Sequence, residues 1–189
     1  MAAKSPTVGA FALPRTGKDA ALLVTLDPGA YTAVVSGVAD TTGVTLVEVY
    51  DAGDMQAGTP KLYNISSRGY VGTDDQILIA GIIVGGNAPK KLLVRAVGPT
   101  LGTLGLAGSL SDPVLTIYNG STVISQNDDW GGDPAHAALS KSLGAFDLPA
   151  NSKDASLLIT LAPGVYTAQV TGKNGAQGIA LVEVYDAGD

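Results

Sequence analysis

The sequence has no cysteine among its 189 residues, which excludes a disulfide framework, a thiolate nucleophile and any metal site built on cysteine. Charge is also scarce. The 11 basic and 17 acidic side chains give a net charge of −6 and leave no basic stripe that could neutralise phosphates. We therefore expect neither nucleic acid nor anionic membrane surfaces as partners. A single histidine also leaves little scope for general acid–base chemistry.

Long hydrophobic runs are missing as well. The longest, residues 77–84, is far shorter than the roughly 20 residues that a membrane-spanning helix needs. Aromatic residues make up only 5% of the chain, whereas 46% of its residues are hydrophobic. This composition is sufficient for a buried core, so the sequence predicts a folded protein without membrane insertion.

The sequence contains an internal repeat. Residues 8–54, the N-terminal copy, align without gaps to residues 143–189, the C-terminal copy, at a fixed offset of 135, and 29 of the 47 paired positions are identical. The unique segment, residues 55–142, lies between them. A period of this size corresponds to one domain rather than to one solenoid turn. We therefore expect a complete domain over 55–189, preceded by a half-repeat over 1–54 without a unique segment of its own.

Both copies show the alternation of β-strands. In the N-terminal copy, two apolar runs at 22–26 and 31–35 flank a Pro-Gly turn of type II, and a third run covers 44–50. Val34 is replaced by Gln169 in the other copy, so Thr32, Val34 and Ser36 are expected to face outward. Tyr31, Ala33 and Val35, which alternate with them, are expected to face the core. Each copy is therefore predicted to be a three-stranded β meander.

The unique segment continues in the same style. Strand-like runs at 61–71, 76–84 and 90–97 are separated by Gly-containing turns. Asn119 and Gly120 lie between two further runs, and this pair is typical of a type I′ hairpin turn.

One helix is expected after these strands. Asp133 is a suitable N-cap, and Pro134 suits the first helical position. Gly144 suits a position just after the last helical residue. The glycine-rich stretch 98–105 lacks the residues of a phosphate-binding loop and is expected to be a plain loop. The pattern as a whole predicts an all-β fold, an antiparallel β-sandwich or jelly roll with one short helix near 134–143.

Four oxygen-bearing side chains follow one of the predicted strands: Asn127, Asp128, Asp129 and Asp133. Calcium binds several carboxylate and carbonyl oxygens in flexible geometry, so this segment is a candidate calcium site, and calcium is the only cofactor that the sequence suggests. The same residues also fit an Asx turn that leads into a helix cap. The sequence leaves both interpretations open.

No catalytic group is predicted. Asp133, His136 and Ser140 would share one face of the expected helix, but side chains on successive turns point the same way and do not converge as a catalytic triad does. Asn64 and Asn119 each begin an Asn-x-Ser acceptor pattern for glycosylation. Asn119 also lies where a hairpin tip favours asparagine for structural reasons.

Three motifs occur in order along the chain: Leu115-Thr-Ile-Tyr118, Asn127-Asp-Asp129 and Pro163-Gly-Val-Tyr166. In this order, residues 112–185 resemble the bacterial pre-peptidase C-terminal type of β-sandwich. A longer block, which includes Val94-Arg-Ala-Val-Gly-Pro-Thr-Leu101, looks like a repeat of large secreted and surface proteins of environmental bacteria. The resemblance implies an extracellular or cell-surface location and a noncatalytic module for adhesion, carbohydrate contact or assembly. It brings no known catalytic residues.

A half-repeat would leave one apolar face uncovered. The side chains on that face are Leu22, Val24, Leu26, Tyr31 and Val35. An uncovered face of this kind is unfavourable in a soluble monomer, so either its own domain or a neighbouring copy is expected to cover it. A head-to-tail contact that does not close generates a filament.

The sequence therefore predicts a structural protein that assembles with itself into an extracellular filament through its half-repeat. The alternative is a carbohydrate-binding or adhesion module of a larger secreted protein, in which Trp130 and a few tyrosines would contact glycans.

Overall fold

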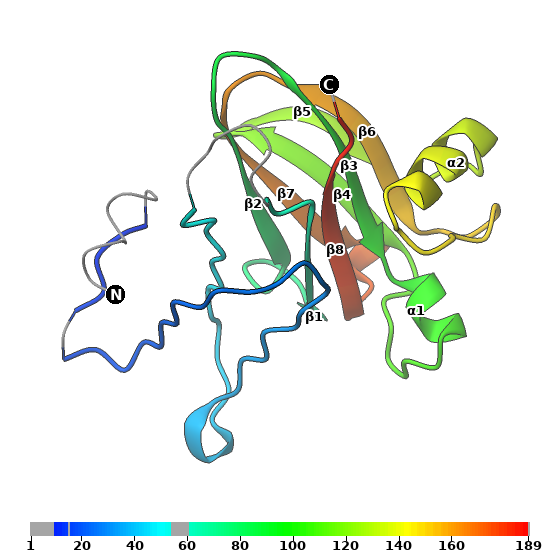
Figure 1. The fold of residues 1–189 in the computed structure, drawn as a ribbon. Coiled ribbons are helices and arrows are strands. Elements are labelled where there is room, and N and C mark those ends of the chain that lie inside the picture. Colours follow the sequence, from blue (N-terminus) through cyan, green and yellow to red (C-terminus); the bar gives the residue numbers. More distant parts are fainter. Residues whose placement is uncertain (1–9, 15, 54–60, 189) are drawn as a thin grey trace. The chain divides into compact units, whose positions relative to one another are not determined.

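The computed structural model describes residues 10–14, 16–53 and 61–188, and the chain divides into two units, Met1–Leu62 and Tyr63–Asp189. The second unit contains all the strands of the described residues (Figure 1). Its elements are, in order, β1 (Asn64–Val71), β2 (Leu78–Val84), β3 (Lys90–Val97), α1 (Pro99–Thr103), β4 (Pro113–Asn119), β5 (Thr122–Asn127), α2 (Pro134–Ser142), β6 (Ala155–Leu161), β7 (Gly164–Gly172), the 3-10 turn η3 (Lys173–Gly175) and β8 (Gly178–Asp186). No helix in the described part of the chain has the length and hydropathy needed to cross a membrane.

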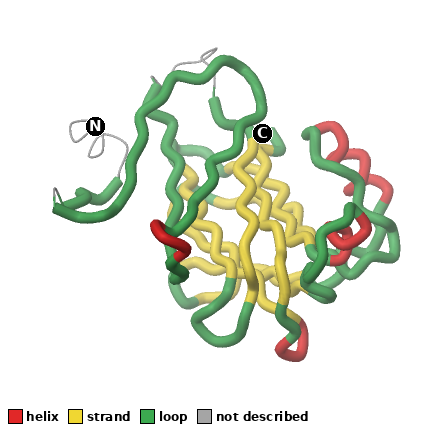
Figure 2. Tube along the Cα trace, turned by 90° about the horizontal axis from the view of Figure 1, so that it is seen from below, coloured by secondary structure: helices red, strands yellow, loops and turns green. Residues whose placement is uncertain are grey.

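The eight strands form two antiparallel sheets of four, in the orders β1-β8-β3-β6 and β2-β7-β4-β5. The sheets pack face to face around a common core, and α1 and α2 lie together at one side of the strands (Figure 2). Apolar side chains from both sheets fill the space between them, among them Val94, Ile117, Ala168, Val170 and Val182. This architecture confirms the predicted β-sandwich.

The alternation predicted for the copies is present in β7. Tyr166, Ala168 and Val170 are buried, whereas the residues between them are half-buried on the other face. These three residues correspond to Tyr31, Ala33 and Val35 of the N-terminal copy. The expectation that this set of side chains faces a core is therefore confirmed for the C-terminal copy.

The predicted meander is wrong for the C-terminal copy. β6 pairs with β3, β7 lies between β2 and β4, and β8 lies between β1 and β3. Within the described residues, no ladder joins any two of these three strands. The turn at Ala162 and Pro163 carries the chain from one sheet to the other instead of closing a hairpin. Alternation determines which face of a strand is buried but not which strand lies beside it.

Local sequence signals predicted some turns and helices of the unique segment correctly and others wrongly. Helix α2 forms as expected, and the Asp133 carboxylate accepts a hydrogen bond of 3.0 Å from the Ala135 N–H. The β4–β5 hairpin also forms, but Asn119 pairs with Thr122 and only Gly120 has positive φ, so the turn is not the predicted type I′. A second helix, α1, begins at Pro99 where a plain loop was expected, because proline suits the first helical position.

The first unit is described over residues 10–14, 16–53 and 61–62. This part holds one 3-10 turn, η2 (Val38–Asp40), and no strand, so the three-stranded meander predicted for the half-repeat is not formed in it. Its five predicted core-facing side chains are more than half exposed, from 52% for Leu26 to 89% for Leu22.

Candidate functional site

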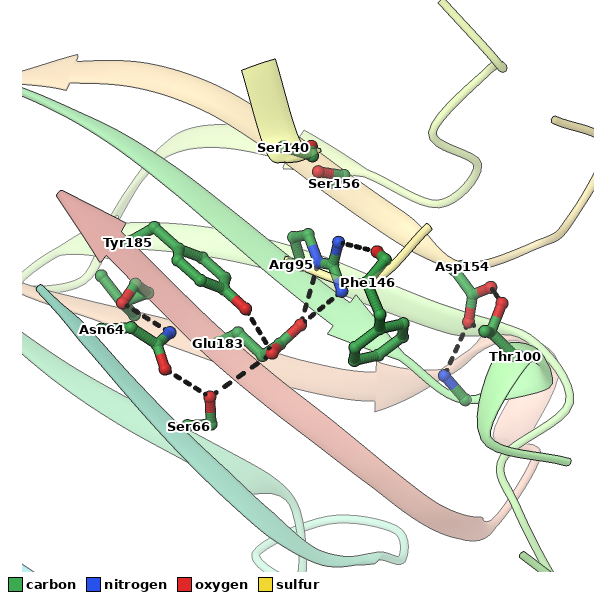
Figure 3. Close-up of polar contacts among 12 residues, drawn as sticks. Asn64, Ser66, Arg95, Thr100, Ser140, Phe146, Asp154, Ser156, Glu183 and Tyr185 are labelled. Carbon is green, nitrogen blue, oxygen red and sulfur yellow. Dashed lines mark hydrogen bonds and ion pairs between the residues drawn. The ribbon is translucent and has the colours of Figure 1, made fainter. Parts of the chain in front are cut away.

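The most extensive buried polar contact joins the C-terminal copy to the unique segment. Arg95 on β3 and Glu183 on β8 are directly paired across the sheet. The Arg95 Nε–H donates to Glu183 Oε2 at 2.9 Å, and Arg95 Nη2 lies 2.7 Å from the same oxygen (Figure 3). Arg95 is fully buried. A buried ion pair of this kind is strongly destabilising to break, since the remaining charge has no partner.

Further groups form hydrogen bonds and a cation–π contact with the Arg95–Glu183 ion pair. The Tyr185 hydroxyl donates to Glu183 Oε1 at 2.7 Å, and Arg95 Nη1 donates to the Phe146 carbonyl oxygen at 2.7 Å. The guanidinium lies 4.5 Å from the centre of the Phe146 ring, a cation–π distance. Burial, followed by the hydrogen bond to Glu183, raises the pKa of Tyr185 above its ordinary value. Phe146 and Glu183 both belong to the C-terminal copy, so this copy surrounds an arginine of the unique segment.

A second polar anchor lies at the start of β6. The buried Asp154 carboxylate accepts hydrogen bonds from the Gly98 N–H at 2.8 Å and the Thr100 N–H at 3.3 Å, and from the Thr100 hydroxyl (Figure 3). The Ser152 hydroxyl donates to the same carboxylate at 2.7 Å. Asp154 therefore ties the C-terminal copy to the first turn of α1 in the unique segment.

Two ion pairs at the surface join the same parts of the chain. Lys153 contacts the Asp112 carboxylate, and Lys173 lies 2.5 Å from Asp128. The hydrogen bond from Lys173 holds the pKa of Asp128 below its ordinary value. Four polar contacts therefore connect the C-terminal copy with the unique segment: the Arg95–Glu183 ion pair, the hydrogen bonds of Asp154, and these two surface ion pairs.

Three of the predicted calcium ligands form hydrogen bonds or ion pairs with protein groups through their side chains. Asn127 accepts from the Ser156 N–H at 2.9 Å and donates to the Asp129 carbonyl oxygen at 2.8 Å. Asp128 is paired with Lys173, and Asp133 caps α2. Among the described residues, no group of three or more acidic, His or Cys side chains is arranged to hold a metal ion. The segment has the geometry of the other interpretation, a turn that leads into a capped helix.

The one histidine contacts a serine of the C-terminal copy. His136 Nε2 lies 2.7 Å from the Ser156 hydroxyl oxygen, and burial lowers the pKa of His136. The Ser140 hydroxyl donates to the His136 carbonyl oxygen at 2.9 Å. A cavity beside these groups, lined in part by Arg95 and Trp130, has a volume of about 90 Å³, far below the roughly 300 Å³ of a small ligand pocket.

The two predicted glycosylation sites lie on different sheets. Asn64 is the exposed first residue of β1, where its amide donates to the Val184 carbonyl oxygen at 3.2 Å and its oxygen accepts from the Ser66 hydroxyl at 3.0 Å. Asn119 is exposed at the end of β4. Modification of either residue stays a prediction.

The five side chains predicted for assembly have direct counterparts in the sandwich. Leu161, Tyr166 and Val170 are buried, and Leu157 and Ile159 pack against the core. They correspond in order of sequence to Leu26, Tyr31 and Val35, and to Leu22 and Val24. The counterparts of the residues predicted for assembly therefore hold the C-terminal copy against the unique segment.

Sequence reasoning did not single out Arg95, Asp154 or Glu183. A signal for two of them was present, because a charged residue recurs at the same place in both copies: Asp19 and Asp154 before the first run, and Glu48 and Glu183 inside the last one. Arg95 occurs once and its partner is 88 positions away, so no local pattern marks it.

No protein family model matches the sequence, and no curated protein matches it. Among solved structures, the chain is similar to the pre-peptidase C-terminal domain of a collagenase from Bacillus anthracis. The two share 11% sequence identity with a TM-score of 0.39, over 65% of this chain and 89% of that one. The assignment of a β-sandwich rests on the two sheets of this protein.

Proposed function

We propose that this chain is a noncatalytic structural module of an extracellular or cell-surface protein, and that its N-terminal copy is a docking element for a second copy of the chain. One observation supports this most directly. All three strands of the C-terminal copy pair with strands of the unique segment. A copy of the repeat therefore forms its inter-strand hydrogen bonds with the strands of a unique segment, which we call the strand set.

The N-terminal copy has the same requirement and a matching surface. Its Leu22, Val24, Leu26, Tyr31 and Val35 are exposed where their counterparts are core residues. Burying apolar side chains contributes roughly 1.5–3 kcal/mol each, so docking of this face is favourable wherever a complementary strand set is accessible. A second molecule supplies such a set in residues 64–127.

The number of copies limits how a filament forms. Each chain contributes one unique segment and two copies that fit it. A head-to-tail filament built by strand addition therefore requires the entering N-terminal copy to displace the C-terminal copy of the next chain. Association through the apolar face alone requires no displacement of the C-terminal copy. We therefore include a filament formed by this route in the proposed function.

The carbohydrate-binding alternative has less support. Trp130, the aromatic side chain on which it relied most, is 8% exposed, and its indole N–H donates to the Pro149 carbonyl oxygen at 2.9 Å. A buried ring offers no open face to a sugar. The extracellular location is proposed from the resemblance of residues 112–185 to secreted modules.

Sedimentation of the full chain over a range of concentrations, with negative-stain microscopy of the same samples, tests the proposal. We expect concentration-dependent assemblies. Val35→Asp, on the face that would be covered, should abolish them, and Val34→Asp is the matched control because its counterpart Gln169 is already polar. A monomer at every concentration, or equal assembly of Val35→Asp, would contradict the docking role. Binding of the same full chain to a glycan array would favour the alternative.

A further inference from the structure

We infer that the N-terminal copy is an alternative occupant of the β6, β7 and β8 positions within its own chain, so that two copies compete for one strand set. This inference goes beyond the proposed function because it needs no second molecule. It rests on the identity of the contacting side chains, on the local conformation of the two copies and on the length of the connection to β1.

Most of the polar anchors of the C-terminal copy are present in the N-terminal copy. Glu183 and Tyr185, which surround Arg95, correspond to Glu48 and Tyr50. Asp154 and Lys153, which bind α1 and Asp112, correspond to Asp19 and Lys18. Phe146, stacked on Arg95, corresponds to Phe11. The N-terminal copy therefore carries the same side chains for each of these contacts.

Most of the core positions are matched as well, although Thr45 takes the place of the buried Ala180. The buried side chains of the C-terminal copy that point between the sheets include Leu161, Tyr166, Ala168, Val170 and Val182. Each of these is the same residue in the N-terminal copy, at positions 26, 31, 33, 35 and 47. Because interiors are close-packed, substitution of one segment by another is tolerated best when volumes are unchanged.

The turns of the N-terminal copy already have the conformation found in the sandwich. The Tyr31 hydroxyl donates to the Asp27 carbonyl oxygen at 3.0 Å, as Tyr166 does to Ala162 at 3.0 Å. The two 3-10 turns share a residue with positive φ, 53° at Ala39 and 55° at Asn174. These turns therefore need no rearrangement before docking.

The connection to the unique segment is long enough for docking in the same chain. β8 and β1 are antiparallel neighbours, with Tyr185 opposite Asn64, and the Asp186 N–H donates to the Tyr63 carbonyl oxygen at 3.0 Å. In the N-terminal copy, Asp51 takes the place of Asp186. Only 11 residues separate Asp51 from Tyr63, which is sufficient for a hairpin loop between adjacent strands.

Several differences favour the C-terminal copy in the intact chain, and one of them is Gly17 in place of Ser152, whose hydroxyl donates to Asp154. Ser156, in contact with His136, is replaced by Ala21, and Lys173, paired with Asp128, is replaced by Val38. The N-terminal copy is therefore the weaker competitor and should take the strand positions when the C-terminal copy is impaired.

Paired substitutions in the full chain test the inference at concentrations where sedimentation shows a monomer. Ala168→Asp places a carboxylate in the core of the C-terminal copy, and Ala33→Asp is the same change in the N-terminal copy. We expect Ala33→Asp alone to leave the thermal transition unchanged and Ala168→Asp alone to lower its midpoint while retaining the β-sheet circular dichroism. The double variant should lose the transition. If Ala168→Asp alone unfolds the protein as fully as the double variant, the inference is wrong.

A disulfide readout identifies the occupant directly, because the chain has no native cysteine. Arg68 on β1 is opposite Leu181 on β8, and Leu46 is the counterpart of Leu181. In the Ala168→Asp background, the Arg68→Cys and Leu46→Cys pair should oxidise to an intramolecular disulfide in most molecules, and in only a small fraction without Ala168→Asp. The Arg68→Cys and Leu181→Cys pair should show the opposite preference. Failure of the Arg68–Leu46 link to form, or its formation between chains only, would overturn the inference independently of whether the wild-type chain assembles.

Discussion

The two copies of the repeat are identical at 29 of 47 aligned positions, yet among the described residues only the C-terminal copy forms strands. Several contacts within four residues are the same in both. Tyr50 donates to Glu48 at 2.9 Å as Tyr185 does to Glu183 at 2.7 Å, and the Gly53 N–H donates to Asp51 as the Gly188 N–H does to Asp186. The difference between the copies therefore lies in their long-range partners.

The same comparison separates two causes of one electrostatic effect. The pKa of Tyr50 is raised chiefly by its hydrogen bond to Glu48, whereas the pKa of Tyr185 is raised first by burial. Local sequence supplies the hydrogen bond in both copies, and only packing against the unique segment supplies the burial. Strand formation in this repeat is thus a property of the pair of segments and not of the copy alone.

The largest expected effect tests whether the buried anchor distinguishes the copies. Glu183→Gln removes the negative charge beside the fully buried Arg95 and should destabilise the sandwich by about 3–5 kcal/mol. Glu48→Gln makes the same change in the N-terminal copy and should alter stability by less than about 0.5 kcal/mol. Urea unfolding of both variants measures the difference, and equal losses would contradict the assignment of this anchor to one copy.

A core truncation should give the next largest contrast. Leu161 is 3% exposed whereas its counterpart Leu26 is 52% exposed. Leu161→Ala should cost about 3 kcal/mol through lost burial and the cavity left behind, and Leu26→Ala should change the stability of the sandwich by less than about 0.5 kcal/mol. Thermal unfolding of the two variants measures this. A comparable loss in Leu26→Ala would show that the N-terminal copy is packed in the monomer.

Exchanging a residue between the copies sharpens the comparison on a smaller scale. Ser156→Ala introduces the alanine found at position 21 and removes the 2.7 Å contact with His136 Nε2. Loss of one hydrogen bond should lower stability by about 1 kcal/mol. The reverse change, Ala21→Ser, is the matched control and should have no effect on the urea midpoint of the monomer.

The smallest effect concerns pH. Burial lowers the pKa of His136 below its ordinary value of 6.5, so below that pH the unfolded chain binds more protons than the folded one. The associated stability is present above about pH 6.5 and is lost as pH falls through the lower pKa of the folded state. His136→Gln should flatten this part of the pH profile of the unfolding free energy. A wild-type profile that rises as pH falls from 6.5 to 5 would contradict the assignment.

Signals confined to a few residues were sufficient to predict α2, the β4–β5 hairpin and the buried face of β7. The neighbours of β6, β7 and β8 could not be predicted, because a Pro-Gly turn after Leu161 fits both a hairpin and a crossing between sheets. The anchor at Arg95 depends on a register between β3 and β8 that follows from the whole arrangement of strands. The calcium site stays a prediction, and sequence reasoning could not foresee that Lys173, distant in sequence, lies beside Asp128.

Hydrogen exchange measured by mass spectrometry on the full chain, at concentrations where it is monomeric, tests the central claim most directly. The claim is that a copy forms strands only when it is paired with the unique segment. Amides of residues 155–161, 164–172 and 178–186 should be strongly protected, and those of 22–26, 31–35 and 44–50 should exchange almost as fast as in an unfolded chain. Equal protection of the two copies in the monomer would contradict the account.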